Sequence, residues 1–176
     1  HDHWDHTGGL WELLNAKKGL KVYGCPNFSK ELKNRGREFK SAFIEADKVT
    51  KVREKIYTTG EISGEYKKEY MPEQALVIET DKGISVITGC AHPGIIKILE
   101  QVKKNFNNKN FYMVFGGFHL MNKDKRVINL IADEFKKLGV QKAGPSHCSG
   151  LEAEEIFRNK YKDDFVEIKV GQTIEV

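Results

Sequence analysis

The chain has 176 residues, of which 39% are hydrophobic and 10% aromatic, values typical of a globular protein rather than a disordered one. Its 29 basic and 25 acidic residues leave a net charge of +4, which is too small to indicate a nucleic-acid partner, although it would help an anionic small molecule to approach. The length predicts one domain, residues 1–176, and no apolar run is long enough to indicate a membrane span.

The first nine residues, His1-Asp2-His3-Trp4-Asp5-His6-Thr7-Gly8-Gly9, hold four candidate metal ligands: His1, His3, Asp5 and His6. The alternating His1 and His3 would project to one side of an extended segment. Asp5 and His6 follow where the chain turns toward the next helix, so we expect them to serve a second metal. Imidazole and carboxylate donors together suit zinc, with iron or manganese as alternatives. An affinity-tag remnant is the competing interpretation, but a tag has no Asp-His-Thr-Gly-Gly continuation.

The next segment predicts a helix that starts near Leu10 and ends at Gly19, followed by a strand over 20–23. Residues 26–50 are polar and predict an irregular segment, whose apolar anchors would be Phe39, Phe43 and Ile44. The basic residues between Lys30 and Lys40 are interpreted as a solvated helix face or loop rather than a binding patch.

Residues 75–80 and 84–88, joined by Asp81-Lys82-Gly83, are typical of a β-hairpin. Pro93 is expected at the first position of a helix, with a buried face made of Ile95, Ile96, Ile98, Leu99 and Val102. The later pattern predicts strand, helix, strand, helix and strand, at 111–115, 127–135 (ended by Gly139), 140–143, 151–159 and 165–170. Such a repeat of strand, ligand and helix favours an α/β layered fold with a site at one rim of the sheet.

The other three histidines, His92, His119 and His147, each follow a short apolar run and lie in a turn marked by Gly or Pro. Junctions between strands and loops are where a rigid sheet presents functional side chains, so we expect one shared site. Cys90 and Cys148 lie within two residues of these histidines. They are interpreted as small buried residues beside the site, with a ligand or redox role as the alternative. Three cysteines without a disulfide-scaffold spacing predict a reducing, cytoplasmic location.

These patterns resemble the metallo-β-lactamase fold superfamily. The resemblance depends on the opening cluster and on four further phrases: Ile56–Glu61, Thr88–Gly94, Gly116–Leu120 and His147–Gly150. They are most similar to the branch related to dihydropterin ribofuranosylaminobenzene-phosphate synthase, over nearly the whole chain from His1 to about Ile168. The resemblance implies an αββα sandwich.

Carried over by motif, the resemblance implies one metal held by His1, His3 and His92. It implies a second metal held by Asp5, His6 and His147, with a bridging water between the two. The cofactor would be Zn²⁺, as one or two ions, with iron or manganese possible.

One position departs from the superfamily, which usually places an acidic or thiol bridging ligand between the single histidine and the last one. Here the candidate position reads Gly117-Phe118-His119 and has no carboxylate. His119 would then be a terminal ligand or a substrate contact, for instance a donor to phosphate.

The chain has no initiating Met, and the superfamily places strands before the opening motif. We therefore expect a truncated chain that covers roughly the last two-thirds of one domain, with its N-terminal strands missing and a sheet edge exposed.

The sequence leaves three functions open. The resemblance implies a metal-dependent hydrolase that uses a metal-activated water on an ester or phosphoester, with Asp5 and His119 as catalytic residues. The alternatives are a pterin-related synthase of methanopterin-type biosynthesis and a non-enzymatic metal-binding or electron-transfer protein. The expected partner is a small-molecule substrate, anionic or phosphorylated, and the sequence indicates no oligomeric state.

Overall fold

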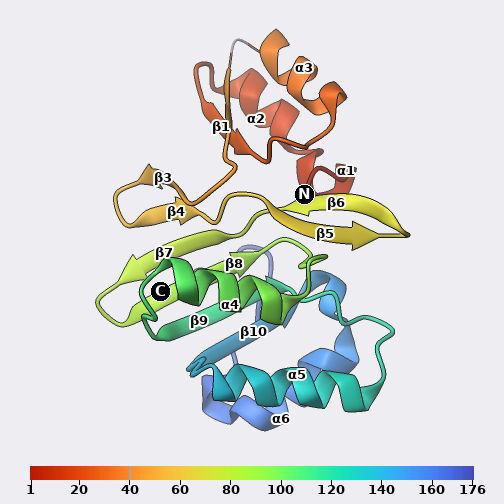
Figure 1. Cartoon of the computed structure of the whole chain (residues 1–176), viewed down its shortest axis with the longest axis vertical. Coiled ribbons are helices and arrows are strands. Elements are labelled where there is room, and N and C mark those ends of the chain that lie inside the picture. Colours follow the sequence, from red (N-terminus) through yellow and green to blue (C-terminus); the bar gives the residue numbers. More distant parts are fainter. Residues whose placement is uncertain (40) are drawn as a thin grey trace.

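The computed structural model describes residues 1–39 and 41–176, so Lys40, at the end of the basic stretch, lies outside the described residues. Its central element is a six-stranded mixed sheet in the order β10-β9-β8-β7-β4-β3 (Figure 1). The strands are β3 (Thr50–Arg53), β4 (Ile56–Thr58), β7 (Leu76–Thr80), β8 (Gly83–Thr88), β9 (Phe111–Gly117) and β10 (Lys142–Ser146). Because β8, β9 and β10 pair in parallel, their carboxyl ends meet at one edge of the sheet.

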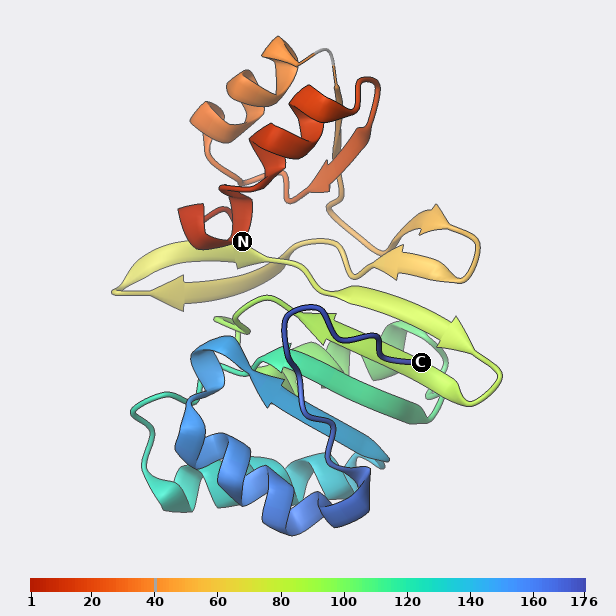
Figure 2. The same ribbon diagram turned by 180° about the vertical axis from the view of Figure 1, so that it is seen from behind.

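The main hydrophobic core lies between this sheet and three helices, α4 (Ile95–Asn105), α5 (Lys125–Lys137) and α6 (Leu151–Tyr161). Its largest buried side chains are aromatic and come from β9, the loop after it and two of the helices: Phe111, Phe118, Phe135 and Phe157. After a short 3₁₀ turn, η2 (Lys162–Asp164), the C-terminal segment crosses the face of the sheet opposite α4 (Figure 2). The sheet is therefore covered by helices on one face and partly by this segment on the other.

The hairpin β7–β8 and the elements at 111–115, 127–135 and 151–159 are where the sequence predicts them. One prediction about these helices is wrong. Pro93 is not the first helical residue, because Gly94, with φ +94°, is the N-cap of α4. The buried face of α5 is formed by Ile128, Ala132 and Phe135, whereas Val127 and Leu130 are exposed.

Two predicted strands near the C-terminus also need correction. The strand expected at 140–143 is β10, which starts at Lys142 and runs to Ser146. Residues 165–170 form no strand, and Phe165 makes only an isolated parallel bridge to Ala143. Val170 is fully exposed, so the apolar alternation there does not reflect pairing with the sheet.

Residues 1–39 and 41–46 form a smaller N-terminal unit above the sheet in Figure 1. Its elements are α1 (Trp4–Thr7), α2 (Leu10–Ala16), β1 (Lys21–Gly24), α3 (Lys30–Glu38) and β2 (Ala42–Glu45), and β1 pairs with β2 in parallel. The predicted helix at Leu10 and strand at 20–23 are confirmed. The unit has a small core of Cys25, Phe28 and Leu32, against which Trp11 and Phe43 pack.

The prediction that residues 26–50 are irregular is wrong, since this segment contains α3, β2 and the first residue of β3. Ser29 caps α3 by accepting a hydrogen bond from the Leu32 N–H at 3.3 Å. This N-cap serine was not recognised in the sequence, because the whole segment is polar. The interpretation of the basic stretch as a helix face fits α3, where Lys30, Arg35 and Arg37 are exposed.

A second hairpin, β5 (Ile62–Tyr66) and β6 (Glu69–Glu73), lies between the N-terminal unit and the main sheet (Figure 1). The sequence pattern predicts neither this hairpin nor the pair β3–β4. The α/β class with a mixed sheet and layered helices is confirmed. Within the described residues, no helix combines the length and apolar character needed to cross a bilayer.

Candidate metal centre

Three of the histidines lie at the carboxyl-end edge of the parallel strands. His92 follows β8, His119 follows β9, and His147 follows β10 at the start of the 3₁₀ turn η1 (His147–Ser149). The loops are tied together, because Thr88 Oγ1 donates to the Gly117 carbonyl at 2.8 Å and the Phe118 N–H donates to Ser149 Oγ at 3.0 Å. Parallel strand order thus gathers histidines that are 27 and 28 residues apart in sequence.

Each of these loops contains a residue other than glycine in the left-handed region. The φ angles are +61° at Ala91, +54° at His119 and +53° at His147. Such conformations cost free energy for residues with a Cβ and concentrate at functional sites. The strained backbone at these three positions therefore sets the direction in which the site side chains point.

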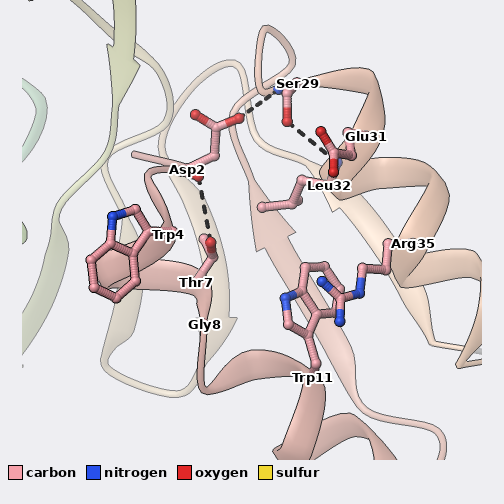
Figure 3. Close-up of a pocket in the computed structure, with 9 residues that line it drawn as sticks. All are labelled: Asp2, Trp4, Thr7, Gly8, Trp11, Ser29, Glu31, Leu32 and Arg35. Carbon is pink, nitrogen blue, oxygen red and sulfur yellow. Dashed lines mark hydrogen bonds between the residues drawn. The ribbon is translucent and has the colours of Figure 1, made fainter.

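The opening segment brings the remaining ligands to this edge. His3 is extended, with ψ 150°, and α1 begins immediately after it. The turn is closed by the Thr7 hydroxyl, which donates to the His3 carbonyl at 3.0 Å. Gly8 is required here, because an added Cβ would lie 2.8 Å from the Trp4 carbonyl oxygen. Asp2 fastens the segment to α3 by accepting a hydrogen bond from the Ser29 N–H at 2.7 Å (Figure 3).

The structure brings together the side chains of the first expected ligand set. One ligand atom each from His1, His3 and His92 lies within 4.8 Å of the others. The ring centroid of His1 is 4.6 Å from that of His3 and 4.7 Å from that of His92. Two residues of the opening segment and one from the sheet therefore converge.

The second expected set, Asp5, His6 and His147, also meets the same 4.8 Å limit. Asp5 Oδ2 lies 3.5 Å from His6 Nε2 and 3.6 Å from His147 Nε2. This set is more open to solvent, since 45% of the His147 side chain is exposed. The two sets are adjacent, because the His1 and His6 rings are 4.0 Å apart.

The free nitrogens of these rings fit a metal. Among the described residues, His1 Nε2, both ring nitrogens of His92 and His119 Nδ1 are buried without a hydrogen-bond partner. Orphaned buried nitrogens are costly unless something binds them. Burial lowers the pKa of His92 to about 4 and also lowers the pKa of His6. Near neutral pH these imidazoles are therefore neutral, which is the form that binds metal.

His119 lies within ligand distance of the same cluster. Its ring centroid is 4.5 Å from that of His92, and it can be grouped with Cys90 and His92 inside 4.8 Å. Burial, followed by the nearby Lys123 charge, lowers the pKa of His119. This placement is compatible with either role expected from the sequence, ligand or substrate contact.

Glu73 is a site residue that sequence reasoning missed. It is 1% exposed, and its carboxylate accepts hydrogen bonds from the N–H groups of Cys90, Ala91 and His92 at 2.8, 2.7 and 2.7 Å. The carboxylate thus holds the loop that presents His92. The only signal in the sequence is an acidic residue at the border of an apolar run, Met71-Pro72-Glu73-Gln74-Ala75-Leu76.

Two thiols lie within the centre. Cys90 is buried, and its Sγ lies 3.2 Å from His6 Nε2, while Cys148 Sγ donates to the Cys90 carbonyl at 3.4 Å. A hydrogen bond with the Cys148 sulfur, reinforced by burial, raises the pKa of the Cys90 thiol, and the same bond lowers the pKa of Cys148. The buried character expected of Cys90 is therefore present, together with close approach to the histidines.

A hollow of about 270 Å³ opens onto the cluster, lined by His3, Asp5, Tyr66, Cys90, His92, His119, Met121, His147 and Cys148. Tyr66, at the end of β5, was not singled out by the sequence. Its ring centroid is 5.3 Å from that of His3 and 5.0 Å from that of His92. The hairpin β5–β6 thus forms one wall of the hollow in which a substrate would meet the candidate ligands.

A second hollow of about 310 Å³ lies beside the opening segment, between Asp2, Trp4, Trp11 and α3 (Figure 3). The Arg35 guanidinium lies 4.4 Å from the Trp11 ring there. None of the clustered histidines lines this hollow, so we assign the candidate reaction site to the first one.

No family model matches the chain. Two curated proteins from Methanocaldococcus jannaschii are similar to it. One, named 7,8-dihydropterin-6-methyl-4-(β-D-ribofuranosyl)-aminobenzene-5′-phosphate synthase, is 28% identical over 99% of this chain and 72% of its own length. The other, an uncharacterized protein, is 29% identical over 99% of this chain and 75% of its own length. A crystal structure described as a metal-dependent hydrolase of the β-lactamase superfamily superposes with a TM-score of 0.76 and 26% identity, covering 93% of this chain and 73% of that chain.

The fold and these similarities place the chain in the metallo-β-lactamase fold superfamily. Within it, the named curated relative is the dihydropterin ribofuranosylaminobenzene-phosphate synthase, the branch that the sequence resembles. The structural neighbour is metal-dependent, which implies a metal cofactor here, and the clustered histidines are possible ligands for it.

Proposed function

We propose that this chain is a metal-dependent hydrolase that attacks an ester or phosphoester with an activated water. The observation that carries the proposal is the convergence of two adjacent ligand sets, His1/His3/His92 and Asp5/His6/His147, beside an open hollow. Zinc suits these donors, as one or two ions, and residues 1–176 would act as a single metallo-hydrolase domain. When bound, such ions supply Lewis-acid polarisation and lower the pKa of coordinated water.

The chain's own residues would perform the remaining tasks. Asp5, whose carboxylate lies between His6 and His147, would hold its metal and orient or deprotonate the nucleophile. His119, whose ring lies 4.5 Å from that of His92, would contact the substrate or the leaving group. Tyr66 would limit the substrate to small molecules that fit between the hairpin β5–β6 and the histidines.

A pterin-related synthase is the second candidate, and it is favoured by the named relative, which matches 99% of the chain. It would use the same hollow, but the histidine-held metal would activate a pterin electrophile instead of a water.

Product analysis on the zinc-loaded full chain separates the candidates. We expect release of p-nitrophenol from an aryl ester or aryl phosphodiester. Formation of a joined product from a dihydropterin and a ribosyl-aminobenzene phosphate, without ester hydrolysis, would support the synthase. Neither reaction, in protein that retains its metal, would favour a non-enzymatic metal-binding or electron-transfer role.

The His119→Ala variant, measured for metal content and kcat/KM on one preparation, tests the role of that residue. Full metal with lowered kcat/KM assigns His119 to the substrate, and lost metal makes it a ligand. If both values are unchanged, His119 has only a structural role.

A further inference from the structure

The two expected ligand sets share no atom, but one side chain lies between them. Cys90 Sγ forms three separate groups inside the 4.8 Å limit: with His1 and His6, with His92 and His119, and with His147 and Cys148. Two of its neighbours, His1 and His92, belong to the first set, and two, His6 and His147, to the second. Cys90 thus occupies the middle of the cluster.

The distances suit coordination. Ligand atoms around one tetrahedral zinc lie roughly 3.3–3.8 Å apart, given bond lengths of about 2.0–2.3 Å. Cys90 Sγ and His6 Nε2 are 3.2 Å apart, close to that range. His1 and His92, which carry buried nitrogens without a hydrogen-bond partner, belong to the same groups as this sulfur.

The last residue of β9, Gly117, has no side chain to offer, so among the described residues the loop after β9 contributes only His119 to the cluster. An added Cβ on Gly117 would lie 2.1 Å from the Gly89 carbonyl oxygen and 2.8 Å from Cys148 Sγ. Phe118 is 1% exposed and packs against Phe135 and Phe157, so it faces the core. The space that a longer side chain at Gly117 would need is therefore taken by the backbone of Gly89 and Cys90 and by the Cys148 sulfur.

The backbone around Cys90 is also held in place before any metal binds. Glu73 Oε1 accepts the Cys90 and Ala91 N–H bonds, so the thiol and His92 are presented by one loop with a fixed conformation. Preorganised ligands of this kind are what a tight metal site requires.

From this placement we infer that Cys90 is itself a metal ligand, a thiolate located where both ligand sets can share it. Binding exchanges the thiol proton for the metal, and the proton leaves to solvent, because a coordinating thiol is deprotonated by the ion's charge. The inference rests on the proposed metal centre and adds a sulfur donor to its nitrogen and oxygen donors. Thiolate also favours zinc over magnesium or calcium.

X-ray absorption on the zinc-loaded full chain tests the inference directly. We expect one sulfur scatterer at about 2.3 Å in addition to nitrogen and oxygen at about 2.0–2.2 Å. Cobalt substitution should add a sulfur-to-cobalt charge-transfer band in the near ultraviolet. Both signals should disappear in Cys90→Ser and persist in Cys148→Ser, the matched control that lies in the same cluster.

A zinc shell containing only nitrogen and oxygen in the wild type would overturn the inference, and this measurement needs no variant to fold. Signals that persist in Cys90→Ser but vanish in Cys148→Ser would overturn it in favour of Cys148. The proposed hydrolase function fails separately, if the sulfur signal is present but esters are not turned over. A folded chain that binds neither zinc nor cobalt overturns both.

Discussion

The N-terminal unit and the sheet with its helices differ in how much apolar surface each buries. The sheet packs Val77, Val86, Phe111 and Val114 against three helices, all nearly inaccessible to solvent. The N-terminal unit buries fewer and smaller groups, a cluster of Cys25, Phe28 and Leu32 with two half-buried aromatic rings, besides Leu14 and Ala46. Burial of apolar surface is the main source of stability, so the N-terminal unit is the weaker of the two.

Hydrogen bonds join the N-terminal unit to the segments on either side of the hairpin β5–β6. Glu61 accepts hydrogen bonds from the Asn27 backbone and side chain at 2.9 and 2.7 Å, and Gln74 Nε2 donates to the Tyr23 carbonyl at 2.9 Å. The candidate ligands are divided in the same way, with four from the opening segment and two, His92 and His147, from the sheet. A bound metal would therefore join the weakly packed region to the strongly packed one.

Removing the metal should have the largest effect, and it should fall unequally on the two regions. A metal at 1,000 times its Kd stabilises the state that binds it by about 4 kcal/mol. After treatment with a chelator, we expect amide hydrogen exchange to accelerate greatly in α1, α2 and α3, while β8 and β9 stay protected. Added zinc should restore protection. Equal acceleration of amide exchange in both regions would contradict the claim that the N-terminal unit depends more on the metal.

Replacing Glu73 with Gln should weaken metal binding by disturbing the loop of the sheet that presents His92. The variant removes the charge that accepts three backbone N–H bonds and puts an amide donor where only acceptors fit. We expect metal affinity to fall about 10- to 100-fold by chelator competition, the usual effect of losing such a support. Glu79→Gln, a surface acid paired with Lys109, is the matched control and should leave affinity unchanged. Equal affinities for Glu73→Gln and the wild type would contradict the positioning role.

The smallest effect concerns the core of the N-terminal unit at high pH. Burial raises the pKa of the Cys25 thiol to about 12, whereas an unfolded thiol has a pKa of about 8.5. Between these values the unfolded chain loses the proton and the folded chain keeps it, so stability falls as pH rises, by at most about 1.4 kcal/mol per pH unit. Urea unfolding between pH 8 and 10 should show a steeper decline for the wild type than for Cys25→Ala. Parallel declines would show that the thiol ionises equally in both states.

The sequence was sufficient for elements and residues with strong local signals. Period-two apolar runs located β7 and β8, and Gly- or Pro-marked turns after apolar runs located His92, His119 and His147. Features that depend on distant partners were missed. Glu73 is recognisable only through N–H groups 17 to 19 residues away, and the central place of Cys90 only through histidines from four different segments.

The prediction that residues 26–50 are irregular was wrong for a different reason. Helix α3 buries only Leu32 and Gly36, so its apolar periodicity is weak and its polar composition dominates the pattern. In the hairpin β5–β6, polar residues and Gly64 interrupt the apolar alternation of β5, and the turn is made by Lys67 and Lys68 without the Asn or Gly that marks most tight hairpins. Tertiary context, rather than local preference, determines both.

Elemental analysis of the folded full chain, purified without chelators, tests the central claim most directly. With six histidines, Asp5 and Cys90 converging on one edge of the sheet, the account predicts about two zinc-like ions per chain. His92→Ala should empty mainly one position and His147→Ala the other. Folded protein that contains no transition metal, and takes up none when zinc is supplied, would contradict the account.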